Sequence, residues 1–453
     1  MDAPLGDKLL RALPALAVRG GGLGLQIAMS LVIARLLGAE GMGLYTLYVT
    51  WLVLFAELIS LGMPIYVLRT VAALKAQGHG AVAGGFLARA LGLVVLIGAA
   101  LMLLPWSFAT PMAAVVADDA SLAPALHIAA AGALLFASLR ILAEALKGVG
   151  ATQRALLAES AVIPLVVLGL LPLLLVEGVL NERHLLWLHV FAVTLALLLT
   201  LIFWLFARPR AAQLPQPQPS QPPPPSLPQP AAFTPPSIIS SALPPLWGST
   251  LLNMAYVSLP ILILPQFASV DELGQFGVAF RLINLVTVIL VTLGAIFGPQ
   301  FAAAYTLRDA SGLRQLLRRS QHFSLLLYGP VFIIFTFFAE PLLGLFGEEF
   351  RSAALLLAIM AMGQLVNAAT GLVGYLLNMM HRERTEFMIL LITGGFMTVA
   401  MIIGGTLAGM LGVTLAYSAG LMLKNLLSLL FSLRALRGLE SAGATTTPSH
   451  APL

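Results

Sequence analysis

Long apolar stretches recur along the whole chain, and each is long enough to cross a membrane as a helix. A hydrocarbon core about 30 Å thick needs about 20 apolar residues in helical form. We therefore predict an all-α polytopic membrane protein with twelve spanning helices, at residues 13–37, 44–68, 84–108, 122–146, 155–176, 185–207, 242–266, 275–304, 321–346, 352–379, 386–408 and 411–433.

Composition excludes a soluble protein. Of the 453 residues, 59% are apolar and only 9% are charged, against roughly 25% charged residues in soluble domains. The absence of cysteine excludes disulfides and thiolate metal sites. No Walker loop, H-E-x-x-H or G-x-S-x-G motif occurs. We predict neither an enzyme nor a metal site or cofactor, and in a membrane protein a net charge of +5 predicts no nucleic-acid partner.

Basic residues predict the orientation, because Lys and Arg remain mainly on the cytoplasmic side. Only Arg35, Arg183 and Arg351 lie in loops on one side. The other side carries Lys8, Arg11, Arg69, Lys75, Lys147, Arg154, Arg208, Arg210, Arg308, Arg314, Arg318, Arg319, Arg382, Arg384, Arg434 and Arg437. Both termini are therefore predicted to be cytoplasmic, with the N-terminus retained as the first span because no small-residue cleavage site precedes it.

A proline-rich segment divides the chain. Residues 209–236 hold twelve of the 29 prolines, a composition that favours extended polyproline II over helix. It could bind a proline-reading domain, but its central position favours a cytoplasmic connector. We predict an N-terminal six-helix lobe at 1–207, a linker at 208–240, a C-terminal six-helix lobe at 241–437 and a disordered tail at 438–453.

The two halves form a weak internal repeat. A shift of about 231 positions superposes Glu40 on Asp271, Gly43 on Gly274 and Tyr45 on Phe276. Each half begins on the same side, which is typical of a parallel repeat about an axis along the membrane normal. Two such bundles leave a central cavity between them, and rocking of the lobes gives alternating access.

Ionisable residues inside predicted spans mark candidate sites, because each costs several kcal/mol unless it has a partner or faces water. Lys424 lies about 18 Å deep at helical rise, so Lys424 and Asn425 are predicted to line the cavity; the alternative is a buried pair with a carboxylate elsewhere. Arg281, about 9 Å inside, either lines the cavity or extends to the membrane surface. Arg19 precedes a glycine-rich run, Gly20 to Gly24, which indicates either a flexible cationic helix or tight packing.

The acidic residues allow two interpretations. Arg140, Glu144 and Lys147 share one helical face and are predicted to form a structural ion cluster. Glu57 and Glu159 have no partner on their own helices, so they are candidates for proton or sodium coupling, or for neutral acids or ion pairs between helices. All buried carboxylates are predicted to lie in the first half. Arg89 is a further basic residue inside a predicted span, and His189 is a weaker candidate.

The excess of buried cations predicts an anionic cargo such as a phosphate or diphosphate headgroup. Amide side chains could contact sugar hydroxyls or join helices: Asn253, Asn284, Gln364, Asn367 and Asn378. Asp118 and Asp119 resemble the metal-binding pair of a glycosyltransferase, but a solvated acidic loop is the preferred interpretation.

Residues 31–45 (LVIARLLGAEGMGLY), followed by residues 61–64 (LGMP) and Arg69, resemble the first two helices of bacterial polysaccharide-biosynthesis flippases. These are the Wzx-type O-unit translocases of the multidrug/oligosaccharidyl-lipid/polysaccharide (MOP) superfamily. Residues 276–282 (FGVAFRL), 298–300 (GPQ) and 376–379 (LLNM) resemble the second half of the same family. His381 departs from the family pattern, as does the long linker.

The resemblance implies two six-helix lobes of the MATE/MOP type, in the bacterial inner membrane, with a cationic central cavity. It implies movement of undecaprenyl-diphosphate-linked oligosaccharide to the outer leaflet for lipopolysaccharide O-antigen or a related surface polysaccharide, with a polymerase and assembly proteins as partners. Arg281 and the other buried cations would contact the headgroup or sugar. Alternatives are a multidrug exporter of the same superfamily, favoured by Glu57 and Glu159, and a membrane polymerase or glycosyltransferase.

Overall fold

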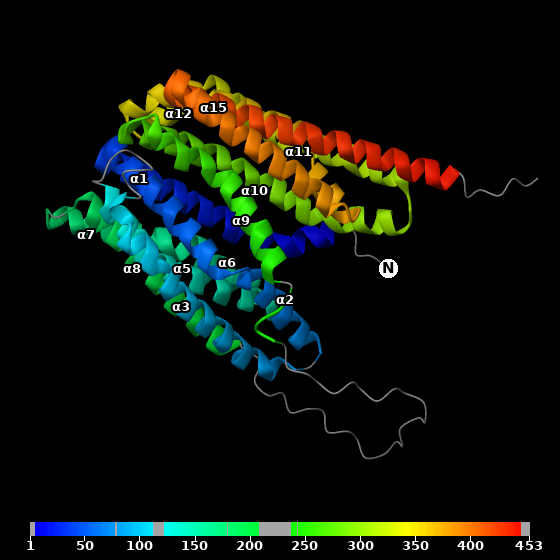
Figure 1. The fold of residues 1–453 in the computed structure, drawn as a ribbon, viewed down its shortest axis with the longest axis horizontal. Helices are drawn as coiled ribbons and strands as arrows, with labels where there is room; N and C mark the ends of the chain where they lie inside the picture. The colour runs from blue at the N-terminus through cyan, green and yellow to red at the C-terminus, as the bar shows by residue number, and fades with distance from the viewer. Residues whose placement is uncertain are drawn as a thin grey trace, which may run out of the picture. The chain divides into compact units, whose positions relative to one another are not determined.

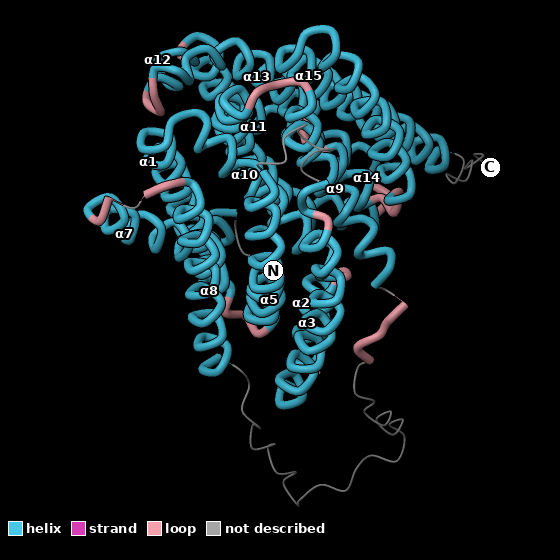
Figure 2. The backbone as a smooth tube through the Cα atoms, turned by 60° about the vertical axis from the view of Figure 1, so that its left-hand side comes forward, coloured by secondary structure: helices cyan, strands magenta, loops and turns pink. Residues whose placement is uncertain are grey.

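The computed structural model describes residues 5–77, 79–111, 122–178, 180–207, 237–241 and 243–444. Within these ranges the regular elements are helices, and no strand occurs among them (Figures 1 and 2). The greater part of the predicted linker, residues 208–236, lies outside these ranges, as do Asp118 and Asp119.

The described part of the first half contains seven α-helices, one 3-10 turn and one π-helical turn. The elements are α1 (Leu5–Ser60), α2 (Met63–Ala76), η1 (Gly80–Val82), α3 (Ala83–Ser107), α5 (Ala123–Gly148), α6 (Thr152–Leu157), the π-helical turn η3 (Ala158–Val162), α7 (Ile163–Val176) and α8 (Glu182–Ala207). Since α6, η3 and α7 follow one another without a gap, they form a single span.

The second half begins after the linker. Its elements are α9 (Leu243–Ile263), η4 (Leu264–Gln266), α10 (Val270–Thr306), α11 (Ala310–Phe337), α12 (Ala339–Gly344), η5 (Glu348–Ala353), α13 (Ala354–Thr370), α14 (Val373–Met379) and α15 (Glu383–Ala444).

Two of these helices are broken into arms. In α1 the break is at Gly38, with φ 66° and ψ −167°. In α15 it is at Ala408 and Gly409, where Gly409 has φ 53°. A residue with a side chain rarely adopts a positive φ, so the glycines allow the chain to turn there. Gly404 and Gly412 then lie against each other, which brings the two arms of α15 side by side.

The helices account for the predicted spans. Nine helices of the described ranges are long and apolar enough to cross a membrane, and the bent α9 makes a tenth. Because α1 and α15 each consist of two arms, the described chain provides twelve spanning segments. The fold is that of an all-α polytopic membrane protein, as the hydropathy predicts.

Besides the span predicted at 44–68, whose helix ends at Ser60 before α2 begins, two predicted boundaries are wrong. The ninth span, predicted at 321–346, is α11 at Ala310–Phe337, followed by the separate α12. The error arises because Arg314, Arg318 and Arg319 lower the hydropathy of its first turns. The Asp309 side chain caps this helix by accepting a hydrogen bond from the Gly312 N–H at 2.8 Å, and that bond, with others from Ser311, lowers the pKa of the Asp309 carboxyl.

The second wrong boundary is that of the C-terminal tail. The helix α15 continues to Ala444, so residues 438–444 are helical although we predicted a disordered tail from 438. An ion pair of 2.9 Å between Arg314 and Glu440 contacts this last part of α15, and Leu436 is fully buried. Packing therefore extends the helix where composition alone does not.

Chain contacts divide the molecule into two compact units. The first consists of Met1–Met29, Trp51–Met112 and Ala123–Leu251; the second consists of Ser30–Thr50, Ala113–Leu122 and Leu252–Leu453. In the first unit α5 packs against α2, α3 and α8, and in the second α13 packs against α10, α11 and α15. The lobe boundaries predicted from the sequence remain a prediction.

Glycine permits very close helix packing within the second unit. A Cβ atom added to Gly274 of α10 would overlap the backbone carbonyl oxygen of Ala39, and one added to Gly43 would overlap that of Val270. A Cβ atom on Gly277 would lie 2.6 Å from the Thr46 hydroxyl. Residues 39–46 of α1 therefore contact α10 backbone to backbone.

Candidate functional site

Glu57 and Arg140 form an ion pair inside the first unit. Glu57 lies on α1 and Arg140 on α5, and the Glu57 side chain is only 3% exposed. The Trp247 indole N–H donates to the Glu57 backbone carbonyl at 3.3 Å. Glu57 was expected to be a coupling acid, a neutral acid or one member of an ion pair between helices. In the structure it forms the ion pair. Arg140 pairs with this carboxylate, whereas Glu144 of the predicted cluster pairs with Lys147.

Lys147 is shared by two carboxylates in the same unit. Its Nζ atom lies 2.8 Å from Glu144 and 2.8 Å from Glu159. Glu144 precedes Lys147 by one turn of α5, whereas Glu159 comes from the π-helical turn η3. The five residues Glu57, Arg140, Glu144, Lys147 and Glu159 thus contain one more carboxylate than cations.

The glycine-rich run on α1 contacts this region at one position only. A Cβ atom on Gly22 would overlap the side chain of Ser160, which lies in η3. Cβ atoms on Gly20, Gly21 and Gly24 would meet nothing within 4 Å. Tight packing is therefore the role of Gly22. Arg19 lies on the same helix, and its side chain is outside the described part of the structure.

Lys424 is paired with a carboxylate that the sequence analysis did not select. Its Nζ atom lies 3.0 Å from the Glu386 carboxylate, which also accepts a hydrogen bond of 2.8 Å from the Ser428 hydroxyl. Glu386 is 7% exposed, so the prediction that all buried carboxylates lie in the first half is wrong. Hydropathy placed Glu386 at the end of a span, whereas the fold buries it beside Lys424. Gly374 leaves room for the pair, since a Cβ there would lie 2.8 Å from Glu386.

Arg281 of α10 differs from the other buried cations. Its guanidinium donates to the Ser30 hydroxyl and lies over the Tyr45 ring, 5.5 Å from the centroid. Both partners belong to the second unit with Arg281. Neither is anionic, and no ion pair of Arg281 occurs among the described residues. Its positive charge is therefore not neutralised by a carboxylate.

Two of the amide side chains form hydrogen bonds within their own helices. Asn367 donates to Gln364 at 2.9 Å within α13, and Asn425, 2% exposed, donates to the Leu421 carbonyl of its own helix at 2.9 Å. Asn253 is exposed, and Asn284 is half-buried on α10. Among the weaker candidates, Arg89 is exposed and His189 is buried.

These features define a class of protein: a polytopic helical membrane protein with charged groups buried within its spans. Intramembrane charges of this kind are typical of transport proteins. Residues 245–403 match the model of the family MatE. A comparison with curated protein sequences found no match.

Solved structures of transporters share the fold over nearly the whole chain. An inward-facing multidrug resistance MATE family transporter of the MOP superfamily has 14% sequence identity and a TM-score of 0.73, with 95% of this chain and 99% of that chain covered. The lipid II flippase MurJ, in an inward closed conformation, has 14% identity and a TM-score of 0.64, covering 98% and 94%. A MOP superfamily transporter from Pyrococcus furiosus, described as having a binding pocket of reverse polarity, has 14% identity and a TM-score of 0.57, covering 95% of each.

The chain is therefore a multi-pass helical membrane protein with the MATE fold, and its residues 245–403 match the MatE family model. Multidrug transporters and a lipid flippase share this fold, so the fold does not assign the cargo.

Proposed function

We propose that this protein is a flippase for undecaprenyl-diphosphate-linked oligosaccharide in the bacterial inner membrane, acting by alternating access in surface polysaccharide synthesis. The observation that carries the proposal is Arg281, a cation in a membrane-spanning helix without a carboxylate partner among the described residues. A guanidinium binds diphosphate oxygens through paired hydrogen bonds. An anionic headgroup would supply the negative charge that neutralises Arg281.

The buried carboxylates argue against a transporter of cationic drugs. Such a cargo needs an acid that is free to pair with it. Glu57 and Glu386 each pair with a basic side chain, and Glu144 and Glu159 share Lys147, so these four acids leave at most one negative charge for a cationic cargo. The multidrug exporter therefore remains the second candidate, supported by the MATE fold rather than by its charges.

Replacing Arg281 with alanine tests the proposal. We expect surface polysaccharide export to fall about tenfold or more, because a charge-assisted hydrogen bond contributes about 1.5–3 kcal/mol. Arg281→Lys keeps the charge and should be milder. The measurement is surface glycan in a deletion strain complemented with each variant. Arg319→Ala, which removes an exposed cation from α11, is the matched control and should export normally.

The lipid-linked intermediate identifies the blocked step. In the deletion strain and in Arg281→Ala, the repeat unit should accumulate on the cytoplasmic leaflet, because its synthesis precedes translocation. Accumulation on the outer leaflet would instead indicate a polymerase, and an intact glycan with new drug sensitivity would indicate the exporter. Normal export by Arg281→Ala would refute the role given to this residue.

We further propose that Glu159 couples transport to a proton or sodium gradient. Lys147 neutralises only one of the two carboxylates that contact it, so the second can take up a proton or a sodium ion. Glu57 suits this role less well, because Arg140 neutralises it alone.

The proposal also includes the membrane orientation and a partner. The distribution of basic residues supports the cytoplasmic position of both termini. The family resemblance supports a polymerase that acts on the translocated product.

Glu159→Gln is expected to reduce export about tenfold while leaving the protein folded, because Lys147 retains Glu144 as its partner. Export in the wild type should fall when the proton or sodium gradient is collapsed, and export by Glu159→Gln should not respond. Thermal denaturation of the purified protein provides the folding control. If Glu159→Gln exports at the wild-type rate and still responds to the gradient, Glu159 is not the coupling residue.

A further inference from the structure

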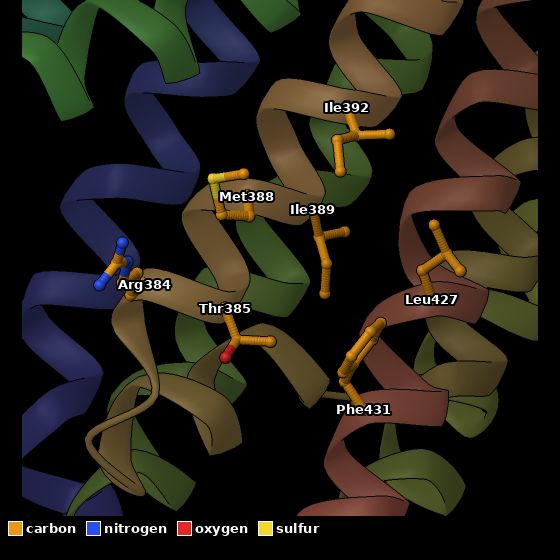
Figure 3. A pocket seen from close by; sticks show the side chains of 7 residues that line it. All are labelled: Arg384, Thr385, Met388, Ile389, Ile392, Leu427 and Phe431. Atoms are coloured by element: carbon orange, nitrogen blue, oxygen red, sulfur yellow. The ribbon is translucent and has the colours of Figure 1, made fainter.

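A cavity of about 300 Å³ lies between the two arms of α15 (Figure 3). Arg384 and Thr385 lie at one end, near the start of the helix. The rest of its wall is apolar and is formed by Met388, Ile389, Ile392, Leu427 and Phe431. We call this cavity the α15 groove. Met388 is 45% exposed and Ile392 is 60% exposed, so the groove is open along one side.

The polar end of the groove is cationic. Arg384 is exposed and forms no ion pair among the described residues. The Arg434 guanidinium lies 5.5 Å from the centroid of the Phe431 ring, which lines the groove. Arg384 therefore lines the groove, and Arg434 lies beside one of its lining residues.

The acidic residues nearby do not neutralise these cations. Glu386 pairs with Lys424 and accepts from Ser428, so its charge is already satisfied. The Glu383 carboxylate lies 3.8 Å from His381 and is largely exposed to solvent. The groove thus combines a long apolar wall with an unneutralised positive end.

This arrangement matches a ligand with one charged end and an apolar chain. From Arg384 to Ile392 the helix rises about 12 Å, which is long enough for part of an acyl chain. The apolar wall excludes a sugar as occupant, and the two cations oppose a cationic drug.

We propose that the α15 groove binds an anionic phospholipid of the bilayer, with one acyl chain along the apolar wall and the headgroup phosphate at Arg384 and Arg434. Basic side chains at a membrane surface attract anionic lipid headgroups. The exposed apolar surface of the groove favours contact with the acyl chain of the lipid. This site does not depend on the cargo proposed above. It would make the protein selective for the lipids that surround it.

Native mass spectrometry of the purified full-length protein, taken from nanodiscs containing phosphatidylglycerol and phosphatidylcholine, tests the site. Wild type should retain phosphatidylglycerol in preference. Arg384→Gln should lower this retention about fivefold, the effect of one cation at a membrane surface. Arg382→Gln removes an equally exposed charge that does not line the groove and should retain phosphatidylglycerol as wild type does.

A second variant tests the apolar wall. Ile392→Trp places a larger side chain in the groove from an exposed position, so the fold should be unaffected and retention should fall. Glycerol phosphate, which has the headgroup chemistry without chains, should not displace the bound lipid. Equal retention in wild type, Arg384→Gln and Ile392→Trp would overturn the proposal. An equal loss in Arg382→Gln would also overturn it. So would an experiment with added polyprenyl phosphate in which Arg384→Gln loses that lipid but retains phosphatidylglycerol as wild type does.

Discussion

Gly274→Ala is expected to prevent most of the protein from reaching a stable fold. The added Cβ would overlap the backbone carbonyl oxygen of Ala39, and a backbone atom cannot move aside as a flexible side chain can. The two helices would have to separate, at a cost of about 3 kcal/mol or more, the upper range of overpacking. The measurement is the yield of monodisperse protein in detergent and its thermal midpoint.

Gly395→Ala on α15 is the matched control. A Cβ at Gly395 would meet nothing within 4 Å. Alanine favours a helix over glycine by about 1 kcal/mol, so this variant should be as stable as wild type or more so. The same chemical change should therefore have opposite effects at two helical positions. A Gly274→Ala protein with the wild-type yield and thermal midpoint would contradict the packing described here.

Lys424→Met should strongly destabilise the protein by leaving the Glu386 carboxylate buried without its cation. Removing one partner of a buried pair costs about 3–5 kcal/mol, and only the Ser428 hydroxyl would remain in contact with the acid. We expect a lower thermal midpoint and less protein in the membrane. The double variant Lys424→Met/Glu386→Gln removes both charges and should recover most of the stability.

The double variant also separates stability from transport. Because Glu386 already neutralises Lys424, we expect this variant to export polysaccharide when it folds. If the double variant is stable but does not export, Lys424 contacts the cargo, as the sequence predicts. If Lys424→Met alone is as stable as wild type, the pair does not contribute to stability.

Much of the fold can be predicted from the sequence, because hydropathy is a local property. The spans at 84–108, 122–146 and 185–207 correspond closely to α3, α5 and α8. The prediction of helix boundaries fails where a membrane helix contains charged residues. The basic first turns of α11 belong to a helix, although their low hydropathy places them in a loop.

The candidate site was predictable only as a set of residues. Sequence analysis selected Glu57, Arg140, Lys147 and Arg281 because a charge inside a span is costly wherever it occurs. It could not select Glu386, which lies at the end of an apolar stretch and becomes buried only when the helices pack.

Composition and hydropathy alone determined that this is a polytopic helical membrane protein, because the length of an apolar helix must match the bilayer. The repeat even superposed Gly43 on Gly274, two residues that prove to lie against each other's helix backbone. The tertiary structure alone decided which charges are neutralised. Glu57 and Arg140 are 83 positions apart, and the separation of Glu386 from Lys424 is also far greater than one helical turn. Such pairs form only when separate helices or helix arms pack together, and their formation leaves Arg281 as a part-buried cation without an acid among the described residues.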